Sequence, residues 1–273
     1  MAKVNQSLEL AILVISCDAY SDAADVFFEL IKKYWTDCKY PLFFINNSII
    51  RNYNNTTLIN AGNELEWSGR LKKSLSQINE KYVLFMLEDY YISKKVNSDD
   101  IANALKIMEQ EGLKYYRITN FPKLKGTFKN YNFLSTIPDN QRYGINLQAA
   151  IWRKDFLLDI LGEKDCSAWE IETDQLKYVK NQFTENIEGC VVDTRNIIDI
   201  YNGVIKGKWV PKTLNHLKKG GYIVPEGERE KMSINSRLVM SLKLIGADVL
   251  SNNMQKGLKP ILSKLGFRFT SKY

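Results

Sequence analysis

The sequence is poor in the residues that build metal centres and disulfide frameworks. Its 273 residues include a single histidine and only four cysteines. The cysteines show neither a CxxC pair nor the spacing of a zinc site, and they are Cys17, Cys38, Cys166 and Cys190. This scarcity excludes the zinc-finger class and the small disulfide-stapled domains. It favours a reducing compartment, and we expect a cytoplasmic protein.

Long hydrophobic runs are also missing. No segment reaches the roughly 18 to 20 apolar residues that a membrane-spanning helix requires. The first residues, MAKVNQSLELAILVIS, contain a short apolar stretch that Glu9 interrupts, without a basic n-region or a small-residue cleavage site. We therefore expect a first β-strand rather than a signal peptide, and a protein that is not integral to a membrane.

The positive charge is concentrated at one end of the chain. From residue 203 to 273 there are fourteen Lys/Arg against four Asp/Glu, whereas the preceding part has 24 against 27. No nucleic-acid-binding motif accompanies this charge, so we expect no nucleic-acid partner. From residue 234 onward, apolar residues at helical spacing alternate with lysines. Two interpretations remain open: helices packed on the main domain, or a basic amphipathic tail on an anionic membrane surface.

The first fifty residues predict an α/β sheet. ELAILVISC (9–17) is a β-branched apolar run, DAADVFFELIKKYW (22–35) has helical spacing of its apolar residues, and PLFFIN (41–46) is a second buried strand. A β-α-β succession with short connections favours a right-handed crossover and a parallel sheet covered by helices. The chain is long enough for one large domain of this class.

The same patterns continue to about residue 202. We expect a polar loop over 46–57, helices over 68–79, 97–112 and 172–183, strands from 82, over 115–119 and over 191–202, an irregular aromatic loop over 121–143, and a strand running into a helix over 149–162. Ser98 or Asp99 is the expected N-cap of the helix over 97–112, and Gly112 its stop.

The strand YVLFMLEDYYI (82–92) ends in two adjacent carboxylates, Glu88 and Asp89. Burying either charge without a partner would cost several kcal/mol or shift its pKa, so the strand is expected to deliver both to a rim. In open α/β sheets, the rim at the carboxyl ends of the strands is where ligands bind. The alternative is a solvated strand end without a ligand.

Several blocks of the sequence together resemble one family. They are ILVISCDAYSDAADVFFELIKKYWTDCKYPLFFINN, WSGRLKKSLSQINEKYVLFMLEDYYI, YGINLQAAIWRKDFLLDIL and SAWEIE. Over roughly residues 10 to 210 the chain resembles the bacterial GT-A-type nucleotide-sugar glycosyltransferases that build capsule and lipopolysaccharide glycans. The resemblance implies a Rossmann-like, mostly parallel sheet flanked by helices over residues 1–221. A basic helical extension over 222–273 would follow it.

The resemblance also implies a place for the acidic pair. Glu88 and Asp89 would lie near the donor diphosphate and hold Mn²⁺ or Mg²⁺, and His216 is a third candidate ligand. The sequence has Glu-Asp-Tyr where the family has Asp-x-Asp, so a metal-independent site stays open. In that case Lys206 and Lys208 could offset the diphosphate charge. His216 could equally be an exposed or packed residue, and the two lysines could lie in an exposed loop.

The motif SAWEIE (167–172) supplies the candidates for a catalytic base. Ser167 could cap a helix that begins near Trp169, which would hold a carboxylate in its first turn ionised and oriented. Glu170 is the first candidate for the base and Glu172 the second. The alternative is a plain capping carboxylate. Trp169 also suits stacking on a sugar.

Further candidates belong to the donor and acceptor sides. On the donor side they are Ser16, Asp18, Tyr20, Trp67, Arg70 and Lys73, and on the acceptor side Gln148, Trp152 and Trp169. Arg70 and Lys73 share a helix face, so both could approach one anionic ligand. A solvated basic face is the alternative for Lys73, and core packing is the alternative for Trp152.

The function expected from the sequence is transfer of a sugar from a nucleotide-diphospho-sugar, in the first place a UDP-sugar, to a glycan or lipid-linked glycan. The expected mechanism is inverting displacement with a Glu base. Two alternatives remain. A sugar-phosphate nucleotidyltransferase would need a glycine-rich, arginine-bearing loop after its first strand, which SCDAYSDA is not. The other is a non-catalytic membrane-surface module on a degenerate transferase fold.

Overall fold

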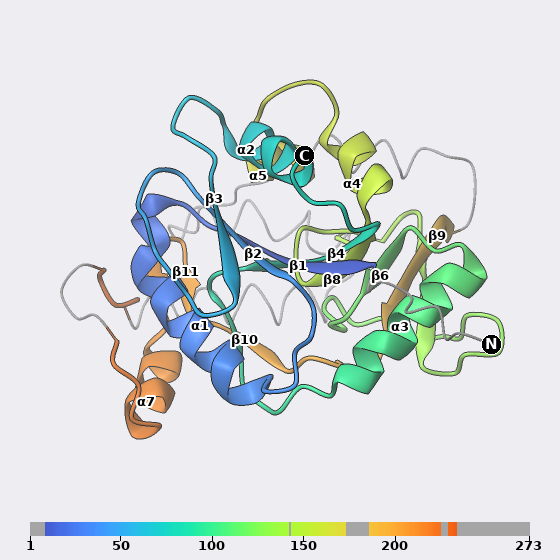
Figure 1. The fold of residues 1–273 in the computed structure, drawn as a ribbon. Helices are drawn as coiled ribbons and strands as arrows, with labels where there is room; N and C mark the ends of the chain where they lie inside the picture. The colour runs from blue at the N-terminus through green and yellow to red at the C-terminus, as the bar shows by residue number, and fades with distance from the viewer. Residues whose placement is uncertain (1–8, 142, 173–185, 225–228, 234–273) are drawn as a thin grey trace, which may run out of the picture.

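The computed structural model describes residues 9–141, 143–172, 186–224 and 229–233. Its centre is an eight-stranded sheet of order β3-β2-β1-β4-β8-β6-β9-β7 (Figure 1). The strands are β1 (Leu10–Ile15), β2 (Leu42–Asn46), β3 (Thr56–Asn60), β4 (Tyr82–Leu87), β6 (Tyr115–Arg117), β7 (Leu134–Pro138), β8 (Ala150–Arg153) and β9 (Asn186–Asp193). Only β8 and β7 run antiparallel to their neighbours. The α/β class and the mostly parallel central sheet are confirmed.

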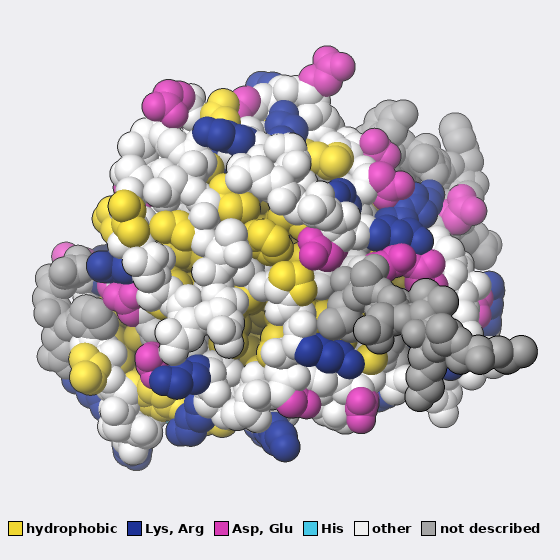
Figure 2. Space-filling model, in the orientation of Figure 1, with side chains coloured by type: hydrophobic (Ala, Val, Ile, Leu, Met, Phe, Trp, Pro, Cys, Tyr) yellow, Lys and Arg dark blue, Asp and Glu magenta, His cyan; other side chains and the backbone are white. Residues whose placement is uncertain are grey.

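Helices cover both faces of this sheet. The helices α1 (Ser21–Tyr34), α3 (Ser98–Glu111) and α7 (Pro211–Lys219) share a core cluster on one face, and α2 (Trp67–Leu75) and α4 (Lys154–Leu161) share a second cluster on the other. Figure 1 shows α2 and α4 above the sheet and α1 and α3 below it. Successive residues of β1 alternate between the two clusters, which explains why its whole run is apolar. On the face seen in Figure 2, hydrophobic side chains gather centrally and most charged ones lie around them.

Short elements complete the carboxyl side of the sheet. They are the 3₁₀ turn η1 (Asp18–Tyr20), the one-turn helix α5 (Ala168–Glu170), the pair β5 (Tyr90–Ile92) with β10 (Ile200–Asn202), and the hairpin β11 (Val204–Ile205) with β12 (Lys208–Trp209). Residues 229–233 lie beside this hairpin, because Trp209 N–H donates to the carbonyl of Glu230 and Met232 N–H donates to that of Trp209. Part of the extension expected over 222–273 therefore contacts the main domain.

The structure contains strands that the sequence did not predict. The expected loop over 46–57 contains the start of β3, and the expected loop over 121–143 contains β7. These are the two edge strands of the sheet, and each has an exposed or partly exposed face, so neither shows a long apolar run. The strand expected over 191–202 is two strands, β9 and β10.

For α3, the predicted N-cap residue is wrong and the predicted C-terminal stop is confirmed. Asn97, rather than Ser98 or Asp99, caps α3 through its side chain, which accepts from Asp99 N–H. Gly112 ends that helix in a left-handed conformation with φ 65°, as expected. The helix expected over 172–183 lies almost wholly outside the described residues, as does the amphipathic tail from residue 234.

Candidate functional site

The sheet brings several polar segments to one edge. The strands β1, β2 and β4 run parallel, so the residues that follow them meet at the carboxyl edge of the sheet. The antiparallel strand β8 begins at this same edge, because Ala150 pairs with Phe85 near the end of β4. The carboxyl edge therefore collects residues 16–18, 46–47, 88–89 and 146–148.

The acidic pair lies at the centre of this edge and is more buried than a rim position would require. Glu88 is only 6% exposed, and Oδ1 of Asp89 is buried without a hydrogen-bond partner. Within the described chain, neither carboxylate forms an ion pair. Burial, reinforced by repulsion from Asp89, raises the pKa of Glu88 well above its ordinary value. Burial also raises the pKa of Asp89, from 3.8 to about 7.

Arg70 fixes the neighbouring strand ends. Its buried guanidinium donates through Nη1 to the carbonyl of Ser16 at 2.9 Å and to Oδ1 of Asn47 at 2.9 Å, while Nε is buried without a partner. The side chain of Asp18 accepts from Ser48 N–H and Oγ–H and from Ile49 N–H. Partial burial alone would raise the pKa of Asp18, but these hydrogen bonds lower it. The loop after β2 is thus held against the end of β1.

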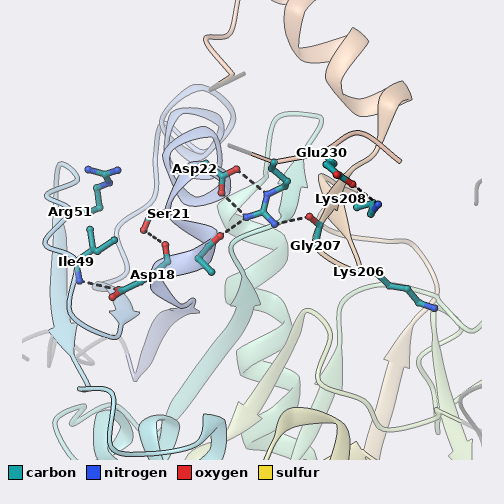
Figure 3. A pocket seen from close by; sticks show the side chains of 11 residues that line it. Asp18, Ser21, Asp22, Ile49, Arg51, Lys206, Gly207, Lys208 and Glu230 are labelled. Carbon is teal, nitrogen blue, oxygen red and sulfur yellow. Dashed lines mark hydrogen bonds and ion pairs between the residues drawn. The ribbon is translucent and has the colours of Figure 1, made fainter. Parts of the chain in front are cut away.

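A cavity of about 660 Å³ opens beside these residues (Figure 3). It is lined by Asp18, Ala19, Ser21, Asp22, Ile49, Arg51, Lys206, Gly207, Lys208, Arg229 and Glu230. Seven of the eleven lining residues are charged, and Lys206 points away from the others in Figure 3. Neither Glu88 nor Asp89 lines this cavity, but both lie within electrostatic reach of Arg229, which does.

Arg229 joins the extension to this wall of the cavity. Its guanidinium donates to both carboxylate oxygens of Asp22, at 2.9 and 2.7 Å, and to the carbonyls of Ala19 and Gly207. It also lies 4.3 Å from the ring centroid of Tyr20. Both side chains of the ion pair are nearly buried, at 8% and 4% exposure. Arg229 therefore forms its ion pair with Asp22, and it interacts with Glu88 and Asp89 only electrostatically at longer range.

The other donor-side candidates are placed as follows. Ser16 is buried, Trp67 is half-buried against Phe85, and the exposed Lys73 donates to the carbonyl of Ala61. Lys206 is exposed at the tip of the β11–β12 hairpin with φ 51°. Lys208 pairs with Glu230 on the cavity wall.

The metal-ligand set expected from the sequence is not assembled as a whole. In the described ranges no three His, Cys, Asp or Glu side chains lie close enough to hold a metal ion. His216 is on the exposed face of α7, with its ring 5.7 Å from that of Tyr201. Glu88 and Asp89 alone still fit a hard divalent cation. Mg²⁺ in particular binds through one or two carboxylates and completes its shell with substrate phosphates and water. The orphaned Oδ1 of Asp89 supports this fit.

The two candidate bases occupy different environments. Glu170 closes a capping box: its Oε2 accepts from N–H and Oγ–H of Ser167, and Lys164 approaches its Oε1 at 3.2 Å. These interactions, first the hydrogen bond from the Ser167 backbone, lower the pKa of Glu170. Glu172 is largely buried, which raises its pKa, although its Oε1 accepts from Leu147 N–H at 3.1 Å. A base that works near neutral pH is better matched by Glu172.

Glu172 also lies nearer to the acidic pair than its sequence position indicates. The phenol of Tyr90 is within electrostatic reach of Asp89, Glu172 and Glu88. Leu147, which contacts Glu172, precedes β8 at the carboxyl edge. Gln148 is half-buried there, and its N–H donates to Oδ1 of Asn146.

The two tryptophans expected on the acceptor side differ in exposure. Trp169 is 58% exposed on α5. Trp152 is fully buried between Tyr115 and Phe156, so in this structure it presents no surface to an acceptor. Core packing, the alternative weighed for Trp152, is what its position shows.

Sequence reasoning missed three residues of this edge: Asp22, Arg229 and the buried Arg117. Asp22 and Arg229 are 207 positions apart, so no local sequence pattern could have paired them. Arg117 donates only to backbone carbonyls, so no partner side chain marks it in the sequence. Among the described residues, no helix is both long and apolar enough to cross a bilayer.

Comparison with known proteins yields structural likenesses alone. No family model and no curated protein sequence matches this chain. Similar solved structures include TarS from S. aureus, whose residues 1–349 with UDP-GlcNAc match at 14% identity and a TM-score of 0.46, over 73% of this chain and 60% of that one. The longer TarS structure matches at 15% and 0.47, over 71% of this chain and 36% of that one. The mannosyltransferase PcManGT from Pyrobaculum calidifontis, with GDP-Man and Mn²⁺, matches at 13% and 0.41, over 68% and 56%.

Of these solved structures, PcManGT is a mannosyltransferase in complex with GDP-Man and one TarS structure is a complex with UDP-GlcNAc, and the chain spans less than two thirds of the length of each. All three TM-scores are below 0.5, so no site residue can be transferred from them. The geometry of the carboxyl edge has to carry any functional conclusion.

Proposed function

We propose that this chain is a glycosyltransferase that takes a sugar from a nucleotide-diphospho-sugar. One observation carries the proposal: at the carboxyl edge of the central strands Glu88 is buried beside the half-buried Asp89, neither forms an ion pair among the described residues, and the buried Oδ1 of Asp89 has no hydrogen-bond partner. Such a pair is costly unless it serves a ligand, since each buried charge loses its hydration. A divalent cation on a diphosphate is a ligand of the right charge.

The residues around the pair have distinct tasks in this proposal. Glu88 and Asp89 would hold Mn²⁺ or Mg²⁺, which when bound supplies positive charge to the departing diphosphate. The cavity beside them would take the nucleotide, with Lys206 and Lys208 at its wall as further cations for the phosphates. Arg70 would keep the ends of β1 and β2 in place beneath the ligand. A UDP-sugar is the first donor to test.

The base of the reaction is Glu172 in this proposal, with Glu170 as the residue that caps α5. The Glu172 carboxylate would accept the proton of an acceptor hydroxyl. The hydroxyl oxygen would then form a bond to the anomeric carbon on one side while the bond to the diphosphate oxygen breaks on the other. One displacement of this kind inverts the anomeric centre, and the nucleoside diphosphate leaves with the electron pair of the broken bond. The acceptor would be a glycan or lipid-linked glycan of a bacterial surface polysaccharide.

The test is release of nucleoside diphosphate from a panel of nucleotide sugars, followed with and without Mn²⁺. We expect turnover of at least one donor, metal-dependent and abolished in Glu88→Gln. Release of pyrophosphate from a nucleoside triphosphate would instead assign the chain to nucleotidyl transfer. If no nucleotide or nucleotide sugar is bound or turned over, the proposal is wrong.

The basic C-terminal part supports a peripheral location at an anionic membrane surface. The last turn of α7 carries Lys218 and Lys219, and Ile223 after it is 92% exposed. Lys32 and Lys33 of α1 line a hollow beside residues 220–222. An apolar side chain among lysines suits an interface with anionic lipids. Sedimentation with vesicles of 30% phosphatidylserine tests this location: we expect binding that weakens in Ile223→Asp and at high salt, and indifference to both would refute it.

A further inference from the structure

Among the described residues, the exposed aromatic side chains are three. Phe121 is 48% exposed, Tyr143 is 45% exposed and Trp169 is 58% exposed. None belongs to either core cluster. Phe121 follows β6 and Tyr143 precedes β8, so both lie at the carboxyl edge, on the half of the sheet away from the nucleotide cavity. Trp169 is on α5, three positions before the proposed base Glu172.

The loops that carry Phe121 and Tyr143 are tied together by one buried cation. Arg117 has no exposed surface, and it donates through Nη2 to the carbonyl of Pro122 at 2.6 Å and through Nη1 to those of Tyr143 and Gly144, at 3.2 and 2.8 Å. Burial lowers the pKa of Arg117, because desolvation disfavours the charged guanidinium. A buried cation without a carboxylate partner is unfavourable on its own, so its value lies in holding these two loops in one arrangement.

The backbone of Tyr143 is strained as well. Its φ is 56°, in the left-handed region that side-chain-bearing residues seldom adopt. Its carbonyl accepts from Arg117 and, at 3.0 Å, from Nδ2 of the buried Asn146. Strain that several hydrogen bonds maintain is a feature of ligand-binding sites. Here it fixes the direction in which the Tyr143 side chain leaves the loop.

The same contacts connect the exposed rings with the proposed base. Oδ1 of Asn146 accepts from Gln148 N–H, and Leu147 N–H between them donates to Glu172. The segment from 143 to 148 therefore carries an exposed ring at one end and orients the proposed base at the other. An acceptor sugar bound to this segment would have a hydroxyl group near the Glu172 carboxylate.

We propose that Phe121, Tyr143 and Trp169 form an acceptor subsite that takes the apolar faces of sugar rings in an oligosaccharide. The C–H bonds on one face of a pyranose carry partial positive charge and suit the negative face of an aromatic ring. Rings on loops that are already fixed lose little conformational entropy on binding. This inference rests on the proposed function, because it assigns the acceptor of the same reaction. A lipid or protein partner on these rings is the competing outcome.

The experiment is saturation-transfer NMR with a panel of neutral di- to hexasaccharides of hexose and N-acetylhexosamine units, at millimolar concentration with UDP and the diamagnetic Mg²⁺ present. We expect saturation on ring C–H protons, with signals that grow from disaccharide to tetrasaccharide. Trp169→Ala and Phe121→Ala should lower the signals at least fivefold, and Trp169→Phe should restore them. Tyr143→Asn, which tolerates the left-handed backbone, tests the third ring. Ile50→Ala, which removes a 67% exposed side chain from the loop after β2, is the matched control and should change nothing.

The outcomes separate this inference from the proposed function. Thermal shifts by nucleotide sugars with Mn²⁺ report the donor site and should be equal in all these variants. Loss of oligosaccharide signals with unchanged donor shifts supports the acceptor subsite. Absence of signals for every oligosaccharide, or equal signals in the wild type and the ring variants, overturns it even where donor binding persists. The rings are more than two-fifths exposed, so the variants should fold, and circular dichroism checks that they do.

Discussion

Replacing Asp89 with asparagine should stabilise the protein while it removes function. In the ligand-free protein, burial raises the pKa of Asp89 from 3.8 to about 7. A difference of about three pKa units corresponds to about 4 kcal/mol, which is the upper limit of the penalty that the ionised side chain imposes on the fold. An amide is also polar and stays buried, so we expect Asp89→Asn to recover about half of this limit, about 2 kcal/mol, at pH 8.

The gain should depend on pH in a defined direction. Folding raises the pKa of Asp89, so between pH 4 and about 7 the native state keeps a proton that the unfolded chain has released. The stability of the wild type therefore falls as the pH rises across this window and is lowest above it. At pH 5 Asp89 is already neutral in the native state, and the gain from Asp89→Asn should shrink to roughly one third of its value at pH 8.

The assay is urea unfolding at pH 5 and pH 8 without metal or nucleotide. At pH 8 a gain of about 2 kcal/mol should also raise the melting temperature by about 4 to 8 °C. Asp159→Asn, at an exposed position on α4, is the matched control and should stay within about 0.5 kcal/mol of the wild type. A variant no more stable than the wild type at pH 8, or a gain equal at both pH values, would refute the reasoning about the buried pair.

Three further predictions concern the base and the cavity wall. Glu172→Gln should lower turnover at least about 100-fold with little change in donor binding, which steady-state kinetics and calorimetric titration can show. Glu170→Ala should lower the melting temperature slightly and leave turnover close to wild type. Since a base must be ionised and burial raises the pKa of Glu172, turnover should fall as the pH drops through that raised pKa; a pH–rate profile with no acid limb would argue against Glu172. Arg229→Ala should cost about 3–5 kcal/mol in urea unfolding because it leaves Asp22 charged and buried, and Asp22→Asn combined with it should cost less than the two single losses added.

The interior of the fold was predictable because both faces of the sheet are covered. Strands such as β1 and β4 are apolar throughout, and α1 shows the periodicity of a helix packed on one side. The edge strands β3 and β7 were missed because neither is apolar throughout: within β3 only Ile59 is buried, and β7 contains the polar Ser135 and Thr136 among its apolar residues. The hydrophobic pattern therefore predicts the buried strands and helices, and it predicts less well the strands at the solvent-exposed edges of the sheet.

The candidate site was predictable in its centre and less so around it. The abrupt end of an apolar run at Glu88 marked the acidic pair, because burying an unpaired carboxylate within a strand is costly. The capping role of Ser167 was visible in SAWEIE, but the same motif drew attention to Glu170 when Glu172 has the more suitable environment. Burial creates that environment, and the N–H that the Glu172 carboxylate accepts from belongs to Leu147, twenty-five positions earlier, so no local pattern contains either cause.

Residues that act across long separations could not be found from one sequence. Arg229 reaches Asp22 from the other end of the chain, and the carbonyls bound by Arg117 belong to two loops that meet only in the folded sheet. Neither arginine was a site candidate from the sequence. Their burial, and with it their role, depends on the strand order of the sheet.

The central claim is that Glu88 and Asp89 serve the diphosphate of a nucleotide sugar through a divalent cation. Calorimetric titration of UDP, with and without Mn²⁺, into the wild type and into Asp89→Asn tests it most directly. We predict binding that Mn²⁺ strengthens at least tenfold in the wild type, with this metal-dependent gain lost in Asp89→Asn. Equal UDP affinity with and without Mn²⁺, or a metal-dependent gain that survives in Asp89→Asn, would contradict the claim.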